Sequence, residues 1–534
     1  MFQVSYHNSG SKLFLKSFSL FLIFAFFVSP VVSQAEGNPG FFTSQPAMLS
    51  VPNGSVLPII TVGDTLPNGY RFEAIPDGIG VLPNGEGTVD VFVNHETSLV
   101  PFPFNANIAA CTSATCQTDF DNAQVSRIRL HQNSAGVLSA EMAITSASNY
   151  QRFCSSFLAD QTVGFRRPIL FTNEEATDFV SPPPLPAWPA HPANQRQAGL
   201  VIALDARNGK TYEIPGMGRL NHENTIFVPG GWDKLVALTG DDTFSAPASQ
   251  LYMYTADSDD EVLADQGSLY AFVADNPAIN DYGDLSGSMS VSGHFIPVPR
   301  EIAVGNQTPL ENWSNANNVF QFIRIEDLDY DLNNPRVVYF ADTGEPRAIP
   351  DAATGRLRRG PSGTQGPYPN GRIFKMVFNA SDPTLVDSLS ILIDGDAGGY
   401  NNFNALHNPD NVGVSANSLM ITEDPGSHNS YAPGTPGAPT GRIWRYDLAT
   451  GVLSVAASID QSADPAARLG AWETSGVIDV SSIFGPGAWL VNVQAHGLFV
   501  ETEVRTVTLP SGASGPVLFK RESGQMLLIH VPGS

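Results

Sequence analysis

The chain has 534 residues, and 42% of them are hydrophobic, which is enough to build a large core and excludes a globally disordered protein. It carries 52 acidic and 28 basic residues, for a formal net charge of -24. Such a charge argues against binding to nucleic acid or to anionic lipid and suits divalent cations. The 48 glycines and 41 prolines indicate many short strands joined by tight turns.

The N-terminus predicts export. Lys12 and Lys16 precede an apolar run at residues 18–32, and the small residues of Ser-Gln-Ala at 33–35 form a cleavage site. This pattern predicts a secretory signal peptide over residues 1–35. A membrane anchor is the alternative, but the apolar run is short for a bilayer span. We therefore expect a secreted or periplasmic protein with no membrane contact after signal cleavage.

Three cysteines fit an exported chain. Cys111 and Cys116 are close enough in sequence to form a small disulfide ring, within what we expect to be an exposed polar loop. Cys154 is left over. An unpaired cysteine is either buried and inert or employed in chemistry, and residue type alone favours the inert alternative.

Residues 36–69 are rich in Pro and Gly and predict an extended lead-in. From residue 70 onward, short apolar runs bounded by Gly, Pro, Asn or Asp predict β-strands. These runs lie at 89–93, 169–171, 200–204, 234–238, 336–340, 418–421 and 489–493.

A second strand pattern recurs along the chain. It has a polar residue, an Ile or Leu, an aromatic residue and a further apolar position, and it occurs at 250–254, 268–272, 372–376 and 442–446. Repetition of one strand type at uneven spacing is typical of divergent propeller blades, with an array of β-sandwiches as the alternative. We predict an all-β chain in which residues 70–534 form a single six-bladed β-propeller.

Four long segments rich in Pro, Gly, Asn and Ser interrupt these strands. We expect them to be loop insertions over one face of the propeller, where functional sites usually lie. They span 181–194, 276–318, 343–370 and 425–441.

Acidic residues and histidines cluster where predicted strands end. A single pair of acidic residues after a strand is typical of an ordinary turn. In a propeller, however, equivalent strand ends point at the same axial opening, so several such pairs would converge. Converging carboxylates repel each other unless cations lie among them, so the pattern predicts a metal site. The candidates from this pattern are His95, Glu96, Glu174, Glu175, His222, Glu223, Asp241, Asp242, Glu326, Asp424 and His496.

The chemistry of the candidate ligands indicates which ions would bind. Carboxylates, with the amide groups of 401–411 nearby, suit Ca²⁺. A softer or trivalent ion would also take a thiolate or an imidazole, which Cys154, His95, His222 and His496 could supply.

These segments resemble the PhoX-type alkaline phosphatases, a family of exported propeller enzymes with a mixed iron and calcium centre. The resemblance spans most of the mature chain and rests on the order and number of short segments. They are 93–96, Cys154 upstream of 173–175, 218–223, 239–242, 267–270, 324–327, 408–411 and 493–496.

The resemblance implies roles for individual residues. Cys154 would be a thiolate bridging two Fe³⁺ ions, with Glu174 or Glu175, Glu223 and Asp410 among the iron ligands. Asp242, Glu326 and Glu473 would help to hold Ca²⁺. Arg324 would bind a phosphate oxygen, so the implied catalytic residues are Arg324, Glu223 and Cys154.

The sequence therefore predicts a monomeric, metal-dependent hydrolase of phosphate monoesters that acts on a small phosphorylated substrate. A guanidinium group matches phosphate geometry, and a metal cluster neutralises charge on the phosphoryl group. Two alternatives remain: a Ca²⁺-dependent propeller hydrolase of the phytase or lactonase type, and a non-catalytic calcium-binding extracellular propeller.

Overall fold

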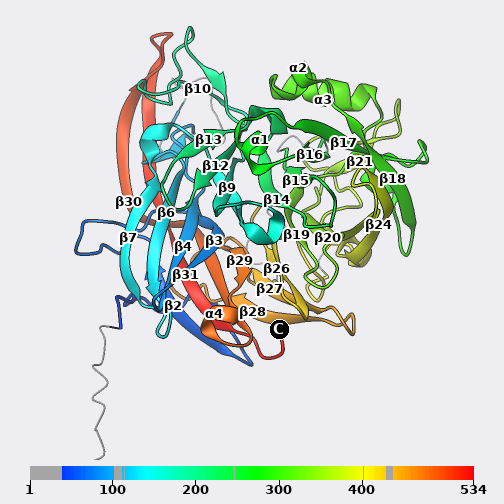
Figure 1. The fold of residues 1–534 in the computed structure, drawn as a ribbon. Coiled ribbons are helices and arrows are strands. Elements are labelled where there is room, and N and C mark those ends of the chain that lie inside the picture. The colour runs from blue at the N-terminus through cyan, green and yellow to red at the C-terminus, as the bar shows by residue number, and fades with distance from the viewer. Residues whose placement is uncertain (1–38, 102–110, 113–114, 244–247, 401, 428–436) are drawn as a thin grey trace, which may run out of the picture. The chain divides into compact units, whose positions relative to one another are not determined.

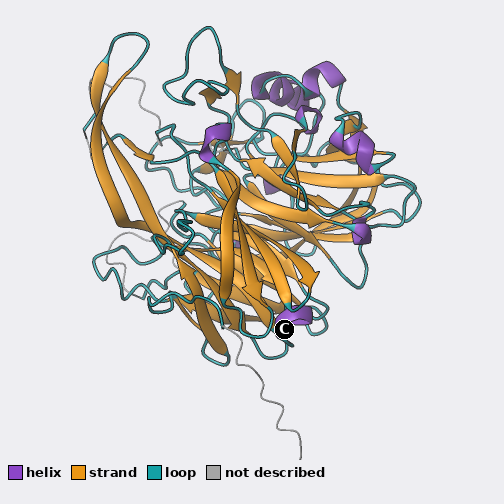
Figure 2. Cartoon of the chain, turned by 60° about the vertical axis from the view of Figure 1, so that its left-hand side comes forward, coloured by secondary structure: helices purple, strands orange, loops and turns teal. Residues whose placement is uncertain are grey.

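The computed structural model describes residues 39–101, 111–112, 115–243, 248–400, 402–427 and 437–534. The predicted signal peptide lies outside these residues. Residues 39–534 form one compact unit, in which strands greatly outnumber short helices (Figures 1 and 2). Among the described residues, no helix has the length and apolarity needed to cross a membrane.

The strands form six antiparallel blades, each a meander that runs outward from an innermost strand. The first three blades follow one another along the chain. Blade 1 contains β3 (Pro76–Gly85), β4 (Thr88–His95), β6 (Gln124–His131) and β7 (Val137–Ile144). Blade 2 contains β8 (Phe153–Ala159), β9 (Ile169–Glu174), β12 (Val201–Asp205) and β13 (Thr211–Glu213). Blade 3 contains β14 (His222–Phe227), β15 (Leu235–Asp241), β16 (Leu251–Ala256) and β17 (Ser268–Ala274).

The remaining blades complete the ring. Blade 4 contains β19 (Ile325–Tyr330), β20 (Val337–Asp342), β23 (Arg372–Phe378) and β24 (Leu385–Asp394). Blade 5 contains β25 (Pro409–Val414), β26 (Ser418–Glu423), β27 (Arg442–Asp447) and β28 (Leu453–Ile459). Blade 6 contains β29 (Glu473–Asp479), β30 (Ala488–Thr508) and β31 (Ser514–His530). The innermost strands contact one another in the order β3, β8, β14, β19, β25, β29 and back to β3, so the predicted six-bladed propeller is confirmed.

The segment expected to be a lead-in supplies two further strands. β1 (Leu49–Ser50) pairs with β28 at the outer edge of blade 5. β2 (Ser55–Thr61) pairs with β31 and becomes the outermost strand of blade 6. The N-terminal part of the described chain therefore closes the last blade against its C-terminal strand.

The predicted strands are apolar throughout because the blades stack face to face. Every residue of β9 is buried, as is nearly all of β4, since both faces of these strands are covered by neighbouring blades. Between blades 1 and 2, for example, Phe92 and Leu170 lie in one buried cluster. All the runs predicted as strands coincide with strands of the structure.

Smaller elements decorate the blades. The segment 276–318 is more ordered than a loop insertion, since it contains the eight-residue strand β18 and two helices. β18 pairs with both β17 and β24 and joins blades 3 and 4 into one sheet. The smaller elements are α1 (Asp259–Leu263), β18 (Ser290–Pro297), α2 (Arg300–Ala303), α3 (Gln307–Ala316), α4 (Ser481–Phe484), β5 (Gln117–Asp119), β10 (Phe179–Val180), β11 (Arg196–Gln197), β21 (Ala348–Pro350) and β22 (Leu357–Arg359).

The predicted disulfide between Cys111 and Cys116 is present. Both cysteines are buried, in contrast to the expected exposed loop, because they pack in an apolar cluster with Val517 and Phe519 of β31. β5 follows directly and pairs in parallel with β31. The disulfide thus lies where an extra strand joins blade 6. Cys154 is free and buried.

Candidate metal centre

The start of each innermost strand carries a potential metal ligand. In five blades the first residue of the innermost strand pairs with the last residue of the second strand, and the register then shifts. Such a β-bulge re-aims the side chain next to it, and bulges are frequent beside active sites. The residues at the second position of these strands are Asp77, Cys154, Glu223, Glu326 and Asp410, and Glu473 begins the sixth innermost strand.

A second set of acidic residues comes directly after the second strand of four blades. Glu96 follows β4, Glu175 follows β9, Asp242 follows β15 and Asp424 follows β26. In blade 6 the long strand β30 carries His496 near the corresponding point. The two sets meet because paired strand ends lie at the same edge of a blade.

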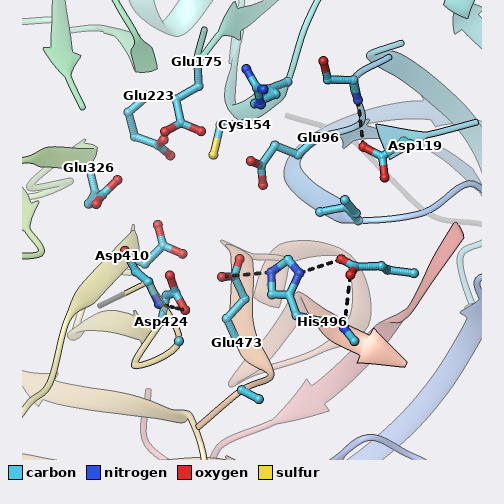
Figure 3. Close-up of a pocket in the computed structure, with 18 of the residues that line it drawn as sticks. Glu96, Asp119, Cys154, Glu175, Glu223, Glu326, Asp410, Asp424, Glu473 and His496 are labelled. Atoms are coloured by element: carbon cyan, nitrogen blue, oxygen red, sulfur yellow. Dashed lines mark hydrogen bonds and ion pairs between the residues drawn. The ribbon is translucent and has the colours of Figure 1, made fainter. Parts of the chain in front are cut away.

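Most of these side chains line one cavity of about 650 Å³. Figure 3 shows them pointing into a common space from strands of different blades. The lining members of the two sets are Glu96, Cys154, Glu175, Glu223, Glu326, Asp410, Asp424, Glu473 and His496. The structure therefore brings together residues that are as much as 400 positions apart in the sequence.

Within the cavity, three groups of side chains are close enough to share a metal ion. Each group has ligand atoms that all lie within 4.8 Å of one another. Cys154 belongs to two groups and Glu223 to two, so the groups form a continuous chain. They are Asp77–Glu96–Cys154, Cys154–Glu175–Glu223 and Glu223–Glu326–Asp410.

The electrostatics of the cluster favour a bound cation. Burial, followed by the charge of Asp77, raises the pKa of Glu223 well above its ordinary value. Burial and Asp77 likewise raise the pKa of Glu96 to about 8. Burial is the main cause of a raised pKa for the Cys154 thiol, with neighbouring carboxylates adding to it. These groups repel one another when ionised, and a cation placed among them would relieve that cost.

The hydrogen bonding on the cavity floor also fits metal ligands. Glu223 Oε1 accepts from the Ser155 hydroxyl at 2.8 Å, whereas Oε2 is buried and has no hydrogen-bond partner among the described residues. The Gln494 amide donates to Asp77 at 3.0 Å, while its carbonyl oxygen is also buried without a partner in the described chain. Buried acceptors without donors are costly unless a cation or water fills the gap.

The donor atoms differ between the first and the last of these three groups of side chains. Glu223, Glu326 and Asp410 offer oxygen atoms only, which suits Ca²⁺. The groups that contain Cys154 add one sulfur, which suits a transition metal once the thiol is ionised. In the structure that thiol donates to Asp77 at 3.1 Å.

Arg324 lies at the edge of the cavity and is held by acceptors. Its Nε and Nη2 atoms donate to both carboxylate oxygens of Asp242, and Nη1 donates to the Ser427 hydroxyl at 2.5 Å. Nη2 also lies 3.5 Å from Glu326 Oε1. Asp242, itself fully buried, does not line the cavity but fixes the guanidinium group that does.

Of the adjacent candidates Glu174 and Glu175, only Glu175 enters the cavity. Glu174 turns into blade 2, where the Arg196 guanidinium donates to its two oxygens at 2.9 Å each. The backbone N–H groups of Gln151 and Leu200 add two more hydrogen bonds. The structure thus gives Glu174 a complete set of internal partners away from the cluster.

The other predicted candidates that lie outside the cavity are also engaged within the blades. His222 bonds with the Thr239 hydroxyl at 2.7 Å and the Gly218 carbonyl at 3.0 Å, and His95 bonds with the Ser126 hydroxyl and the Ala74 carbonyl. Burial lowers the pKa of both histidines to about 4, so both are neutral. Asp241 accepts from the Thr243 hydroxyl.

Sequence reasoning missed Asp77, which contacts Cys154 at the floor of the cluster. It lies in Pro-Asp-Gly, a sequence typical of a turn, and it precedes an apolar run instead of following one. The candidates on the innermost strands share one signal, a polar residue or cysteine at the start of an apolar run. A search for that signal in every blade would have found Asp77. Also missed were Asp119, Arg152, Glu345, Arg359, Arg468, Lys520 and Glu522, which line the cavity.

These features define a six-bladed β-propeller with an acidic axial cavity, whose side chains are close enough to hold metal ions. Among solved structures, the fold is similar to PhoX of Pseudomonas fluorescens in complex with vanadate, a transition state analogue. That likeness has a TM-score of 0.57 and 14% sequence identity, and it covers 92% of this chain and 97% of PhoX. At this identity it establishes the shared fold.

Other solved structures are more distant. The tricorn protease gives a TM-score of 0.32 at 9% identity, over 84% of this chain and 34% of that chain. The NanB sialidase of Streptococcus pneumoniae gives a TM-score of 0.35 at 9% identity, over 85% of this chain and 68% of that chain. The chain matches no family model and no curated protein sequence.

Proposed function

We propose that the protein is a metal-dependent phosphatase that hydrolyses small phosphate monoesters in the axial cavity. The observation that carries this proposal is the continuous series of ligand groups through Cys154 and Glu223. At its centre lies Glu223 Oε2, which has no hydrogen-bond partner among the described residues. The fold likeness to PhoX, which was solved in complex with vanadate, a transition state analogue, supports this proposal.

The charge balance of the cavity makes cations necessary for such a substrate. Among the described residues, ten carboxyl side chains and five Arg or Lys side chains line it. If all were ionised, the lining would have five excess negative charges and would repel a phosphate dianion. Ca²⁺ and Fe³⁺ together could reverse that sign locally.

The ligands would divide between the ions by donor type. Glu223, Glu326 and Asp410 would hold Ca²⁺, and Cys154 with Glu96 or Glu175 would hold iron. When bound, these ions would neutralise the phosphoryl oxygens and make the phosphorus more electrophilic.

Arg324 would bind the substrate phosphate. Asp242 fixes two of its nitrogen atoms, so the guanidinium plane is already oriented before substrate arrives. Arg324 and Ser427 both line the cavity, so Nη1, which donates to the Ser427 hydroxyl, would exchange that partner for a phosphate oxygen. Ser427 would then be free to donate to the same phosphate.

We further propose that the protein is exported and acts as a monomer. The disulfide between Cys111 and Cys116 supports export, because disulfides persist in oxidising compartments outside the cytosol.

The test is turnover of p-nitrophenyl phosphate by protein purified without chelators, with Ca²⁺ and iron supplied and metal content measured. We expect Glu223→Gln to lower kcat/KM at least about 100-fold, because it removes a ligand shared by two groups. Wild-type turnover no higher than that of this variant would refute the proposal. Calcium without iron, with activity kept in Cys154→Ser, would instead favour the calcium-only hydrolase.

A further inference from the structure

One wall of the cavity carries a row of side chains with alternating charge. It begins at Glu473, whose Oε2 lies 3.4 Å from His496 Nε2, and His496 Nδ1 bonds with Glu522 Oε2 at 2.8 Å. Lys520 Nζ then lies 3.2 Å from Glu522 and 3.2 Å from Asp119. Figure 3 shows the link between Glu473 and His496, and it also labels Asp119.

Backbone groups fix two of the three carboxylates of the row. The Gly497 N–H donates to Glu522 at 3.1 Å, and the Ser98 N–H donates to Asp119 at 2.9 Å. Asp119 is the last residue of β5, and it is the register partner of Lys520 in β31. The row is therefore built on strands and is not a chance meeting of surface side chains.

The Lys520 and Glu522 side chains of the row are shielded from solvent. Only 15% of the Lys520 side chain and 8% of the Glu522 side chain are exposed, so solvent screens the row weakly.

We propose that Lys520 and Asp119 are positioning residues, which act through Glu522 and His496 to orient the Glu473 carboxylate toward a metal ion in the cavity. The inference rests on the proposed function and adds to it that Glu473, which lines the same cavity, helps to hold Ca²⁺. His496 engages one oxygen of Glu473 while the carboxylate lines the cavity beside Asp410 and Asp424. Groups hydrogen-bonded to a metal ligand commonly set its orientation in this way.

Removing Lys520 would break the row at its centre. Glu522 and Asp119 would then face each other without the cation between them, and Glu522 would lose one of the two cations that hold it. His496 would follow Glu522, and the Glu473 carboxylate would lose its fixed orientation. Arg at position 520 keeps the charge and can reach both carboxylates.

The experiment measures Ca²⁺ binding to chelator-treated protein by titration calorimetry, independently of turnover. We expect Lys520→Met to weaken Ca²⁺ binding about 10- to 100-fold and Lys520→Arg to keep it within about threefold. The matched control is Lys234→Met, which removes an exposed ion pair with Asp257 in blade 3 and should leave Ca²⁺ affinity unchanged.

The design separates positioning from folding and from the proposed function. Asp119→Asn should weaken Ca²⁺ binding about tenfold, and it provides the measurement if Lys520→Met does not fold. Unchanged affinity in the folded Lys520 or Asp119 variants, or equal losses in Lys520→Met and Lys520→Arg, would overturn the positioning role alone. Absence of Ca²⁺ binding in the wild-type protein would overturn the proposed function as well.

Discussion

Two sets of buried acidic residues lie one position apart on the same strands and have opposite surroundings. The last residue of the second strand points into its blade, as Glu174 and Glu423 do, and we call these residues the blade-facing set. The next residue points into the cavity, as Glu175 and Asp424 do, and these residues form the cavity set. Glu423 accepts from the Arg442 guanidinium, the Trp444 indole and two backbone N–H groups.

Within the part of the chain that the structure describes, the Glu175 side chain accepts no comparable set of hydrogen bonds. Burial raises its pKa well above the ordinary value, and the charges of Asp242, Glu96 and Glu223 add to the effect. Burial of a carboxylate is therefore common to both sets. What distinguishes Glu175 from Glu174 is that the neighbouring charges that shift its pKa most belong to other acids instead of to donors, and this difference fits a metal ligand.

The largest loss of stability should come from a substitution in the blade-facing set. Glu423→Gln would leave Arg442 buried without its anion and would place an amide N–H₂ against other donors. We expect a loss of about 3–5 kcal/mol in the free energy of unfolding, measured with denaturant in the presence of chelator. Asp424→Asn is the matched control in the cavity set and should not destabilise the metal-free protein. Equal losses in the two variants would remove the distinction between the sets.

A smaller effect is expected from the neighbouring pair Glu175 and Glu174. Glu175→Gln removes a ligand and a repulsive charge together. It should weaken metal binding at least about tenfold while the metal-free protein keeps or gains stability. Glu174→Gln should do the reverse, because it breaks the ion pair with Arg196 but leaves the cavity intact. Calorimetric titration with metal and denaturant unfolding distinguish the two results, and a Glu174 variant with lost metal affinity would contradict the assignment.

The smallest expected effect is on the pH dependence of stability and concerns Asp342, which also faces its blade. Its carboxylate accepts hydrogen bonds from the backbone N–H groups of Ile323, Arg324 and Gly344. Burial raises its pKa from 3.8 to about 7. Between these values the folded chain holds a proton that the unfolded chain has released, so stability falls as pH rises, by up to about 1.4 kcal/mol per pH unit.

Asp342→Asn removes this titration. The plot of unfolding free energy against pH, measured in chelator between pH 5 and 6.5, should be flatter than that of the wild type by about 1 kcal/mol per pH unit. Parallel plots for the two proteins would show that Asp342 ionises normally in the fold.

The propeller could be predicted from the sequence because its strands repeat and are buried on both faces. The runs at 89–93 and 169–171 became second strands of blades, as their apolar character required. The choice between Glu174 and Glu175 could not be predicted, because side chains alternate along a strand and the register that assigns each to a face is a property of the pairing. Asp77 escaped notice because Pro-Asp-Gly is also a common turn sequence.

Closure of blade 6 by β2 makes the two ends of the chain depend on each other. Thr61 and Gln525, which are 464 positions apart, share a buried hydrogen bond across the seam. The ring is complete only when the C-terminal strands have been made, and the innermost strands that carry the candidate ligands are held in place by that ring. A nascent or C-terminally truncated chain would therefore present its acidic residues without a centre. We expect the protein to acquire metal only after synthesis of the whole chain is complete.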